Sequence, residues 1–141
     1  MVPFLYFCTR KESCDMAEHN DVGKWGEDVA VEFLRRKGYV VKERDWRYKH
    51  RDIDIIALTE DLMTLVFVEV KTRSSREVTL PEDAITRDKI ISIGYSANAY
   101  IRMNRIMLNI RFDIITVVGN REAGTPSIEH WEGAFDPMLV Y

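Results

Sequence analysis

The feature that most constrains this chain is a pair of apolar runs that each contain charged residues. Residues 62–73 (LMTLVFVEVKTR) are rich in β-branched and aromatic residues, which is typical of a strand. Residues 52–58 (DIDIIAL) have the same character, and the polar residues 59–61 between the runs predict a hairpin turn. A buried carboxylate or ammonium is costly unless it is paired or holds a metal. The positions of Asp54, Glu69 and Lys71 therefore call for an explanation.

Side chains alternate between the two faces of a strand. In the first run, alternation places Asp52, Asp54 and Ile56 on one face and Ile53, Ile55 and Ala57 on the other. In the second, Glu69 and Lys71 share the face of Leu65 and Phe67. Asp54 and Glu69 would then lie on neighbouring strands, close to each other.

The remaining patterns predict a mixed α/β fold. Helical spacing of apolar residues covers residues 22–37, with Asn20 or Asp21 as the N-cap and Gly38 at the left-handed C-terminal cap. Strands are predicted over residues 39–47, 108–118 and 127–131, and a second helix over residues 82–104. The resulting order is α-β-β-β-α-β-β, which implies a mixed sheet with helices packed on its faces.

The length of 141 residues suits one domain. We expect residues 1–15 to be an N-terminal extension outside the fold and residues 16–141 to form the domain, with Met16 as a natural start. No apolar run is long enough to span a membrane. The short apolar stretch of residues 2–8 lacks the basic n-region and the A-x-A-like cleavage site of a signal peptide. The two cysteines, Cys8 and Cys14, predict neither a zinc site nor a disulfide framework. A cytoplasmic location is the default expectation.

A shared metal ion would explain the buried charges. Mg²⁺ prefers oxygen ligands and is usually held by one or two carboxylates, together with water and substrate phosphate. Asp54 and Glu69 could hold such an ion, and Lys71 could orient a water or neutralise charge on a phosphate. The alternative is an ion pair of Lys71 with Asp54 or Glu69 that only neutralises itself. The combined pattern favours the metal site.

The charge distribution allows local contact with nucleic acid. The net charge is −3, but residues 42–51 hold five basic and two acidic residues, and residues 71–76 hold three basic residues and no acid. Phosphate contacts depend on such local clusters more than on whole-chain charge. Composition alone favours the other interpretation, a solvated surface.

Several motifs around these residues resemble one family. They are Gly23-x-x-Gly26-Glu27-x-x-Ala30, Gly38-Tyr39, Trp46-Arg47, residues 52–57 (DIDIIA), residues 66–73 (VFVEVKTR), Lys89 and Arg111-Phe112-Asp113. Across about residues 20–135 the chain resembles the YraN-like family of predicted endonucleases. The resemblance implies a restriction-endonuclease-like core, also found in Holliday-junction resolvases, with a PD-(D/E)xK nuclease centre.

The resemblance assigns roles residue by residue. Asp54 and Glu69 match the metal carboxylates, Lys71 matches the catalytic lysine, and Glu27 matches an acidic residue that can join the metal shell. The alternative for Glu27 is a favourable interaction with the positive end of the helix dipole. Arg51-Asp52 stands where the family usually has Gly-Glu, which puts the reach of that acid in doubt.

Other residues have weaker functional interpretations. Arg47, Arg73 and Lys89 could bind phosphates, although Lys89 could also only extend along the edge of its helix. Tyr95 and Tyr100 are expected to pack against the sheet. Asp113 is interpreted as a structural residue.

The sequence therefore predicts an endonuclease that uses Mg²⁺ or Mn²⁺ to hydrolyse phosphodiester bonds. The expected partner is nucleic acid, DNA in preference to RNA, with branched DNA as one candidate substrate and no membrane. Related resolvases act as dimers, so a homodimer is a further expectation from the resemblance. The alternatives are a nucleic-acid-binding module that does not cut, and a protein scaffold in which the acids are structural.

Overall fold

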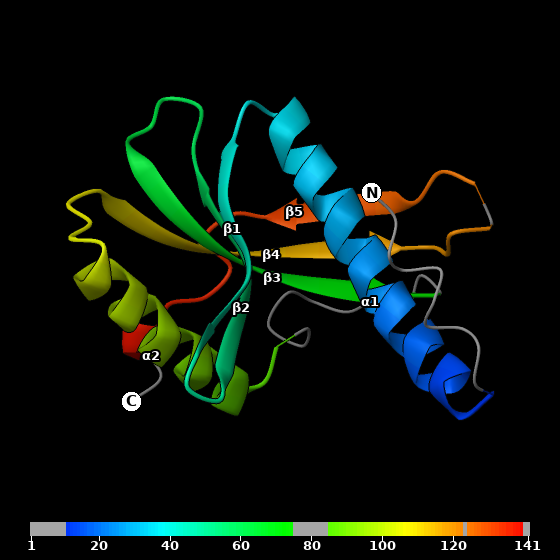
Figure 1. Cartoon of the computed structure of the whole chain (residues 1–141). Coiled ribbons are helices and arrows are strands. Elements are labelled where there is room, and N and C mark those ends of the chain that lie inside the picture. Colours follow the sequence, from blue (N-terminus) through cyan, green and yellow to red (C-terminus); the bar gives the residue numbers. More distant parts are fainter. Residues whose placement is uncertain (1–10, 75–84, 123, 140–141) are drawn as a thin grey trace.

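The computed structural model describes residues 11–74, 85–122 and 124–139. Its elements are α1 (Lys11–Arg36), β1 (Val40–Tyr48), β2 (Arg51–Leu58), β3 (Thr64–Arg73), α2 (Arg87–Met103), β4 (Asn109–Val118), β5 (Ser127–Trp131) and a short 3-10 helix (Pro137–Leu139) (Figure 1). The predicted mixed α/β class and the order α-β-β-β-α-β-β are confirmed.

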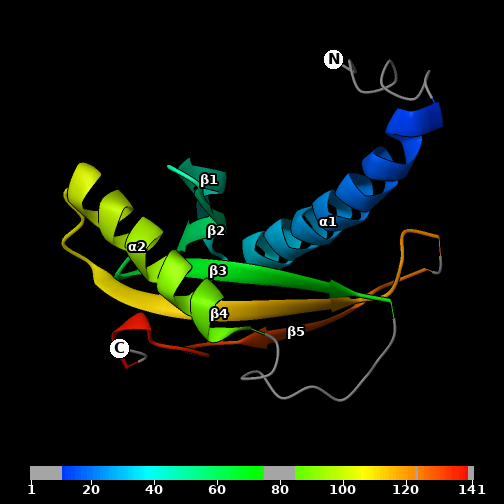
Figure 2. The same ribbon diagram turned by 90° about the horizontal axis from the view of Figure 1, so that it is seen from below.

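The five strands form one sheet in the order β1-β2-β3-β4-β5. β1–β2, β2–β3 and β4–β5 are antiparallel, so the predicted β2–β3 hairpin is confirmed. β3 and β4 run parallel, and α2 makes the crossover between them. Figure 2 shows the β1–β2 hairpin rising from the plane of the other strands, between the two helices.

The helices cover opposite faces of the sheet. Val66 and Val68 of β3 are buried in a cluster with residues of α1. Leu65 and Phe67, which alternate with them, are buried in a second cluster with residues of α2. Ile93, Ala97 and Tyr100 are the buried residues of α2 in this second cluster. β3 therefore runs through the centre of the core, and Glu69 continues its α2 face.

β2 departs from simple alternation around Asp54. Ile55 packs in the α1 cluster and Ile56 in the α2 cluster, but Ile53 also packs in the α2 cluster. The prediction that Ile53 shares a face with Ile55 was therefore wrong. The β2–β3 pairing stops at Ile55 with Val68, and Asp45, on the stretch of β1 opposite Asp54, has a positive φ of 47°. The strand bends where it leaves β3, so the regular period of two is lost.

The ends of α1 give one wrong prediction and one right one. The helix begins at Lys11, so Asn20 and Asp21 lie inside it and neither occupies the N-cap position. Gly38 does adopt the left-handed conformation, with φ of 88°. The Tyr39 N–H donates to the Leu34 carbonyl at 3.0 Å, which closes the C-terminus as expected for this cap. Because α1 starts so early, Glu27 lies deep inside the helix, where the dipole interaction is negligible.

Tyr95 also differs from its prediction. Tyr100 packs against the sheet and is buried, but Tyr95 is 53% exposed on the surface of α2. Among the described residues, no helix is both long and apolar enough to cross a membrane.

Gly26 allows α1 to approach β3 closely. A Cβ atom at Gly26 would lie 1.9 Å from Thr72 Oγ1 and 3.0 Å from Thr72 Cβ. The second distance involves an atom fixed to the backbone, so rotation of the threonine side chain alone would not relieve the clash. The absence of a side chain at Gly26 thereby sets the distance between the helix that carries Glu27 and the strand that carries Glu69 and Lys71.

We predict that Gly26→Ala destabilises the protein by about 1–3 kcal/mol through overpacking. Gly23→Ala is the matched control, because a Cβ there meets nothing within 4 Å. An alanine at this helical position should be neutral or stabilising, by up to about 1 kcal/mol. Thermal denaturation of both variants tests the prediction, which is wrong if the two variants are equally stable.

Candidate functional site: a carboxylate and lysine centre at the β2–β3 junction

Where β2 and β3 separate, the Asp54 side chain accepts a hydrogen bond that a backbone carbonyl would accept in a continuous ladder. The Val70 N–H of β3 donates to Asp54 Oδ2 at 2.8 Å. The β2–β3 ladder ends two residues before Val70, at Val68. The side chain of Asp54 therefore satisfies a donor that would otherwise need a strand partner. This bond fixes the Asp54 carboxylate beside β3, next to Glu69.

Glu69 lies between two lysines. The residue is only 5% exposed, its Oε1 lies 3.3 Å from Lys71 Nζ, and its Oε2 lies 3.9 Å from Lys89 Nζ. Lys89 Nζ is also 3.4 Å from Asp52 Oδ1. The Glu69–Lys71 ion pair considered as an alternative is thus present. It is part of a larger cluster with residues of β2, β3 and α2.

The carboxylates of this cluster disfavour each other's charge. Burial and the Asp54 carboxylate raise the pKa of Glu69, Lys89 and Lys71 oppose this rise, and the net pKa is about 7. Burial also raises the pKa of Asp54, although its hydrogen bond from Val70 acts in the opposite direction. For Lys89, burial lowers the pKa, but the attraction of Glu69, Asp52 and Asp54 outweighs it and the net pKa is raised. Lys89 therefore keeps its positive charge beside Glu69.

Glu27 approaches Asp54 from α1. Both residues line a cleft of about 350 Å³, together with Val22, Gly23, Val70 and Thr72. Burial, together with the charge of Asp54, raises the pKa of Glu27 to about 7. Asp54 is therefore flanked by one glutamate from α1 and another from β3.

The donor set fits a hard divalent cation. Glu27 Oε1 and Glu69 Oε2 are buried without a hydrogen-bond partner, which is costly for a carboxylate. A cation between Asp54 and Glu69 would satisfy the Glu69 oxygen and offset the Asp54 charge that contributes to the raised pKa of Glu69. Across the described parts of the chain, no three acidic, histidine or cysteine side chains already converge on one point. Two carboxylates are nevertheless enough for Mg²⁺, which keeps water and substrate phosphate as its other ligands.

The structure separates the three predicted phosphate-binding residues. Lys89 belongs to the centre itself, because Thr86 caps α2 and places Lys89 in the first turn beside β2. The sequence pattern predicts a helix from residue 82, which would place Lys89 in the second turn. Recognising Thr86 as the N-cap would have placed Lys89 in the first turn. Arg47 is exposed on β1, opposite Asp52 of β2. Arg73 lies at the end of β3 with its Nε buried and without a hydrogen-bond partner.

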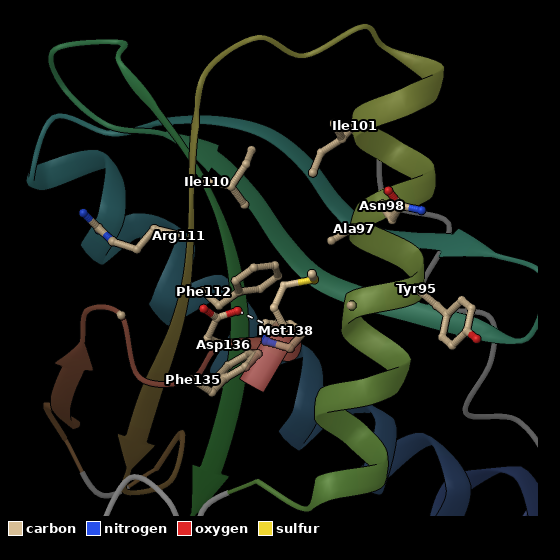
Figure 3. Close-up of a pocket in the computed structure, with 13 residues that line it drawn as sticks. Tyr95, Ala97, Asn98, Ile101, Ile110, Arg111, Phe112, Phe135, Asp136 and Met138 are labelled. Atoms are coloured by element: carbon tan, nitrogen blue, oxygen red, sulfur yellow. Dashed lines mark hydrogen bonds between the residues drawn. The ribbon is translucent and has the colours of Figure 1, made fainter. Parts of the chain in front are cut away.

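The centre is distinct from a larger cavity on the α2 side of the sheet. That cavity, of about 770 Å³, lies between α2, β4 and the C-terminal 3-10 helix (Figure 3). Its lining is largely apolar and includes Ile101, Ile110, Phe112, Phe135 and Met138. None of Asp54, Glu69 and Lys71 lines it. Of these three residues, Asp54 lines the separate cleft of about 350 Å³ that it shares with Glu27.

Asp113 has a structural role, as predicted. It is fully buried and accepts hydrogen bonds from Arg111 Nε at 2.9 Å and from the Gly133 N–H at 2.9 Å. His130 Nε2 lies 2.7 Å from its other oxygen. Burial would raise the pKa of Asp113, but the hydrogen bonds from His130, Arg111 and Gly133 lower it below its usual value. This network links β4 to β5.

The raised pKa values predict how stability depends on pH without added metal. Glu27 and Glu69 have folded-state pKa values of about 7, above the usual 4.5. Their contribution to stability is therefore complete below pH 4.5 and is lost as the pH rises through 7. The melting temperature should fall between about pH 5 and pH 8.

Glu69→Gln should flatten this dependence, because a neutral amide does not ionise. Glu129→Gln is the matched control, since Glu129 is exposed on β5. Differential scanning calorimetry over this pH range is the measurement. An equal slope in Glu69→Gln and Glu129→Gln would contradict the assignment.

Comparison with known proteins identifies the family. The sequence profile of the uncharacterised protein family UPF0102 matches residues 26–117. A UPF0102 protein of Bacteroides fragilis is 47% identical over 124 residues, which is 88% of this chain and 99% of the relative. One from Flavobacterium psychrophilum is 48% identical over 120 residues, 85% of this chain and 98% of the relative. One from Porphyromonas gingivalis is 42% identical over 125 residues, 89% of this chain and 90% of the relative. The chain belongs to the uncharacterised protein family UPF0102, the YraN family that its motifs resemble.

Proposed function

We propose that this protein is a metal-dependent endonuclease that hydrolyses phosphodiester bonds of nucleic acid. The observation that carries the proposal is the arrangement of Asp54, Glu69 and Lys71 at the separation of β2 and β3. Two adjacent carboxylates, one with a buried oxygen lacking a hydrogen-bond partner, lie beside a lysine whose side chain is 32% exposed. This is the donor set that Mg²⁺ and a phosphate require together.

Asp54 and Glu69 would hold Mg²⁺ or Mn²⁺, with Glu27 reaching it directly or through water. When bound, the ion polarises the phosphate and lowers the pKa of a coordinated water. Asp54 is held in position by the Val70 N–H, so its carboxylate needs little rearrangement. Such preorganisation is the main way in which a site of fixed charges stabilises a transition state.

The two lysines have different roles in this proposal. Lys71 follows Glu69 by two residues on the same face of β3, and its ammonium can orient the attacking water or neutralise the charge that grows on the phosphate. Lys89 is shared by Asp52 and Glu69 and balances the negative charge of the centre. Asp52 thereby acts on the centre through Lys89, which gives a role to the acid whose reach was in doubt.

A cleavage screen tests the proposal. Linear, single-stranded, flapped and branched DNA and RNA should be incubated with Mg²⁺ or Mn²⁺. We expect cleavage that depends on metal and falls by about 100-fold or more in Lys71→Ala and in Glu69→Gln. Arg102→Ala and Glu129→Gln are controls, because these exposed residues lie in the last turn of α2 and on β5. Unchanged cleavage in Lys71→Ala and Glu69→Gln would contradict the proposal.

One observation favours a second candidate function. The ion pairs of Glu69 with Lys71 and Lys89 allow the centre to neutralise itself without a metal. The protein would then hold nucleic acid without cutting it. Salt-dependent binding without cleavage in any metal, and with no change in melting temperature on metal addition, would favour this binding module over the endonuclease.

A further inference from the structure

A second group of side chains lies beside the carboxylate and lysine centre. We call it the aromatic–basic surface and define it by Tyr48, Lys49, Arg51 and Tyr95. The Arg51 guanidinium lies 4.7 Å from the centroid of the Tyr95 ring. Lys49 Nζ lies 5.4 Å from the centroid of the Tyr48 ring. Tyr48 and Arg51 are cross-strand partners at the end of the β1–β2 hairpin, so both contacts belong to one surface.

Tyr95 has no role in the core. It is 53% exposed, and Figure 3 shows its ring extending from α2 away from Ile110 and Phe112 of the large cavity. Because more than half of the residue is exposed, its phenol ring, with the Arg51 guanidinium beside it, offers a flat surface to solvent. Arg51 limits its motion through a cation–π contact.

Aromatic rings packed on the α2 core cluster support the hairpin end of this surface. Trp46 stacks on Tyr48 with ring centroids 6.1 Å apart and an interplanar angle of 3°. Trp46 also contacts the buried Tyr100 edge to face, with centroids 5.2 Å apart. The hairpin end is therefore anchored to the α2 core cluster rather than free to move.

The charge of this region suits a polyanion. Residues 46–51 (WRYKHR) hold three cationic residues, one histidine, two aromatic residues and no acid. The next acid along β2, Asp52, is already paired with Lys89. Alternating cations and aromatic rings bind single-stranded nucleic acid, because cations contact phosphates while the rings stack on bases.

The surface lies a short distance from the proposed catalytic residues. Arg51 precedes Asp54 by three residues on β2, about 10 Å along a strand. Arg51, which contacts Tyr95, is followed in β2 by Asp52, and Asp52 shares Lys89 with Glu69. A base stacked on Tyr95 would therefore lie close to a phosphate bound at Glu69, on the same strand of the nucleic acid.

We propose that Tyr95 and Arg51 form a stacking site for an unpaired base of the nucleic acid, with Lys49 contacting the adjacent phosphate. This inference rests on the proposed function for the identity of the substrate, and it names the substrate class as nucleic acid with an unpaired strand next to the cleaved bond. A base inside a duplex has both faces covered by its neighbours and cannot stack on Tyr95.

Binding without cleavage tests the stacking site. Fluorescence anisotropy in EDTA should be measured with end-labelled oligodeoxythymidylate, oligouridylate and a blunt DNA duplex. Tyr95→Ala should weaken binding of the single strands by about 5-fold or more, the loss expected for one stacked base. Its effect on duplex binding should be much smaller. Tyr95→Phe should bind like the unchanged protein, because it keeps the ring.

Salt dependence separates stacking from charge. Arg51→Ala should lower the slope of log affinity against log salt by about one, whereas Tyr95→Ala should leave this slope unchanged. Met107→Ala is the control for loss of an exposed side chain, since Met107 is 94% exposed in the α2–β4 connection. Weaker binding of Tyr95→Ala to oligodeoxythymidylate, to oligouridylate or to both supports the site. Which of the two loses affinity assigns the site to DNA, RNA or both. Unchanged single-strand binding in Tyr95→Ala, or an equal loss on the duplex, would overturn it.

The failure of this inference can be distinguished from failure of the proposed function. If cleavage requires metal and Glu69 but Tyr95→Ala binds single strands normally, the stacking site is contradicted and the endonuclease proposal stands. If single-strand binding depends on Tyr95 but no metal supports cleavage, the endonuclease proposal is contradicted and the stacking site stands.

Discussion

The hydrogen bond from the Val70 N–H to Asp54 is the interaction on which the centre depends. It forms where β2 stops pairing with β3, so a side chain takes the place of a backbone partner. The separation of the strands creates the cleft, and the bond fixes Asp54 at its edge. Glu69 directly follows Val68, the last residue of β3 that pairs with β2. Without this bond, the two carboxylates would have no fixed relation to each other.

The electrostatic consequences follow from that position. Asp54 lies between Glu27 of α1 and Glu69 of β3, and burial together with this proximity raises the pKa of both glutamates to about 7. Lys71 and Lys89 compensate for part of the charge at Glu69. Glu27 reaches the cleft only because Gly26 lets α1 pack against Thr72. The absence of a side chain at Gly26 therefore helps to set the geometry of the centre.

Much of this arrangement could be predicted from the sequence, because its signals are local. The strand patterns, the hairpin turn and the Gly38 cap each depend on a few adjacent residues, and all three predictions were confirmed. The start of α1 was wrong because residues that often cap a helix also occur inside one. Ile53 was placed on the wrong face because a strand bend is set by tertiary contacts. The positions of Lys89 and Tyr95 depend on how α2 is rotated about its axis against the sheet. Hydrophobic periodicity defines the apolar face of a helix only to within about one residue, so it does not fix this rotation.

The central claim is that Asp54 and Glu69 together hold a divalent cation. Anomalous diffraction from crystals grown with Mn²⁺ tests it most directly. We predict one anomalous peak within about 2.0–2.2 Å of an oxygen of each carboxylate, the distance range expected for a small hard cation. Glu69 should then turn away from at least one of its two lysines. The absence of a peak at this position, with Glu69 still paired to Lys71 and Lys89, would contradict the claim.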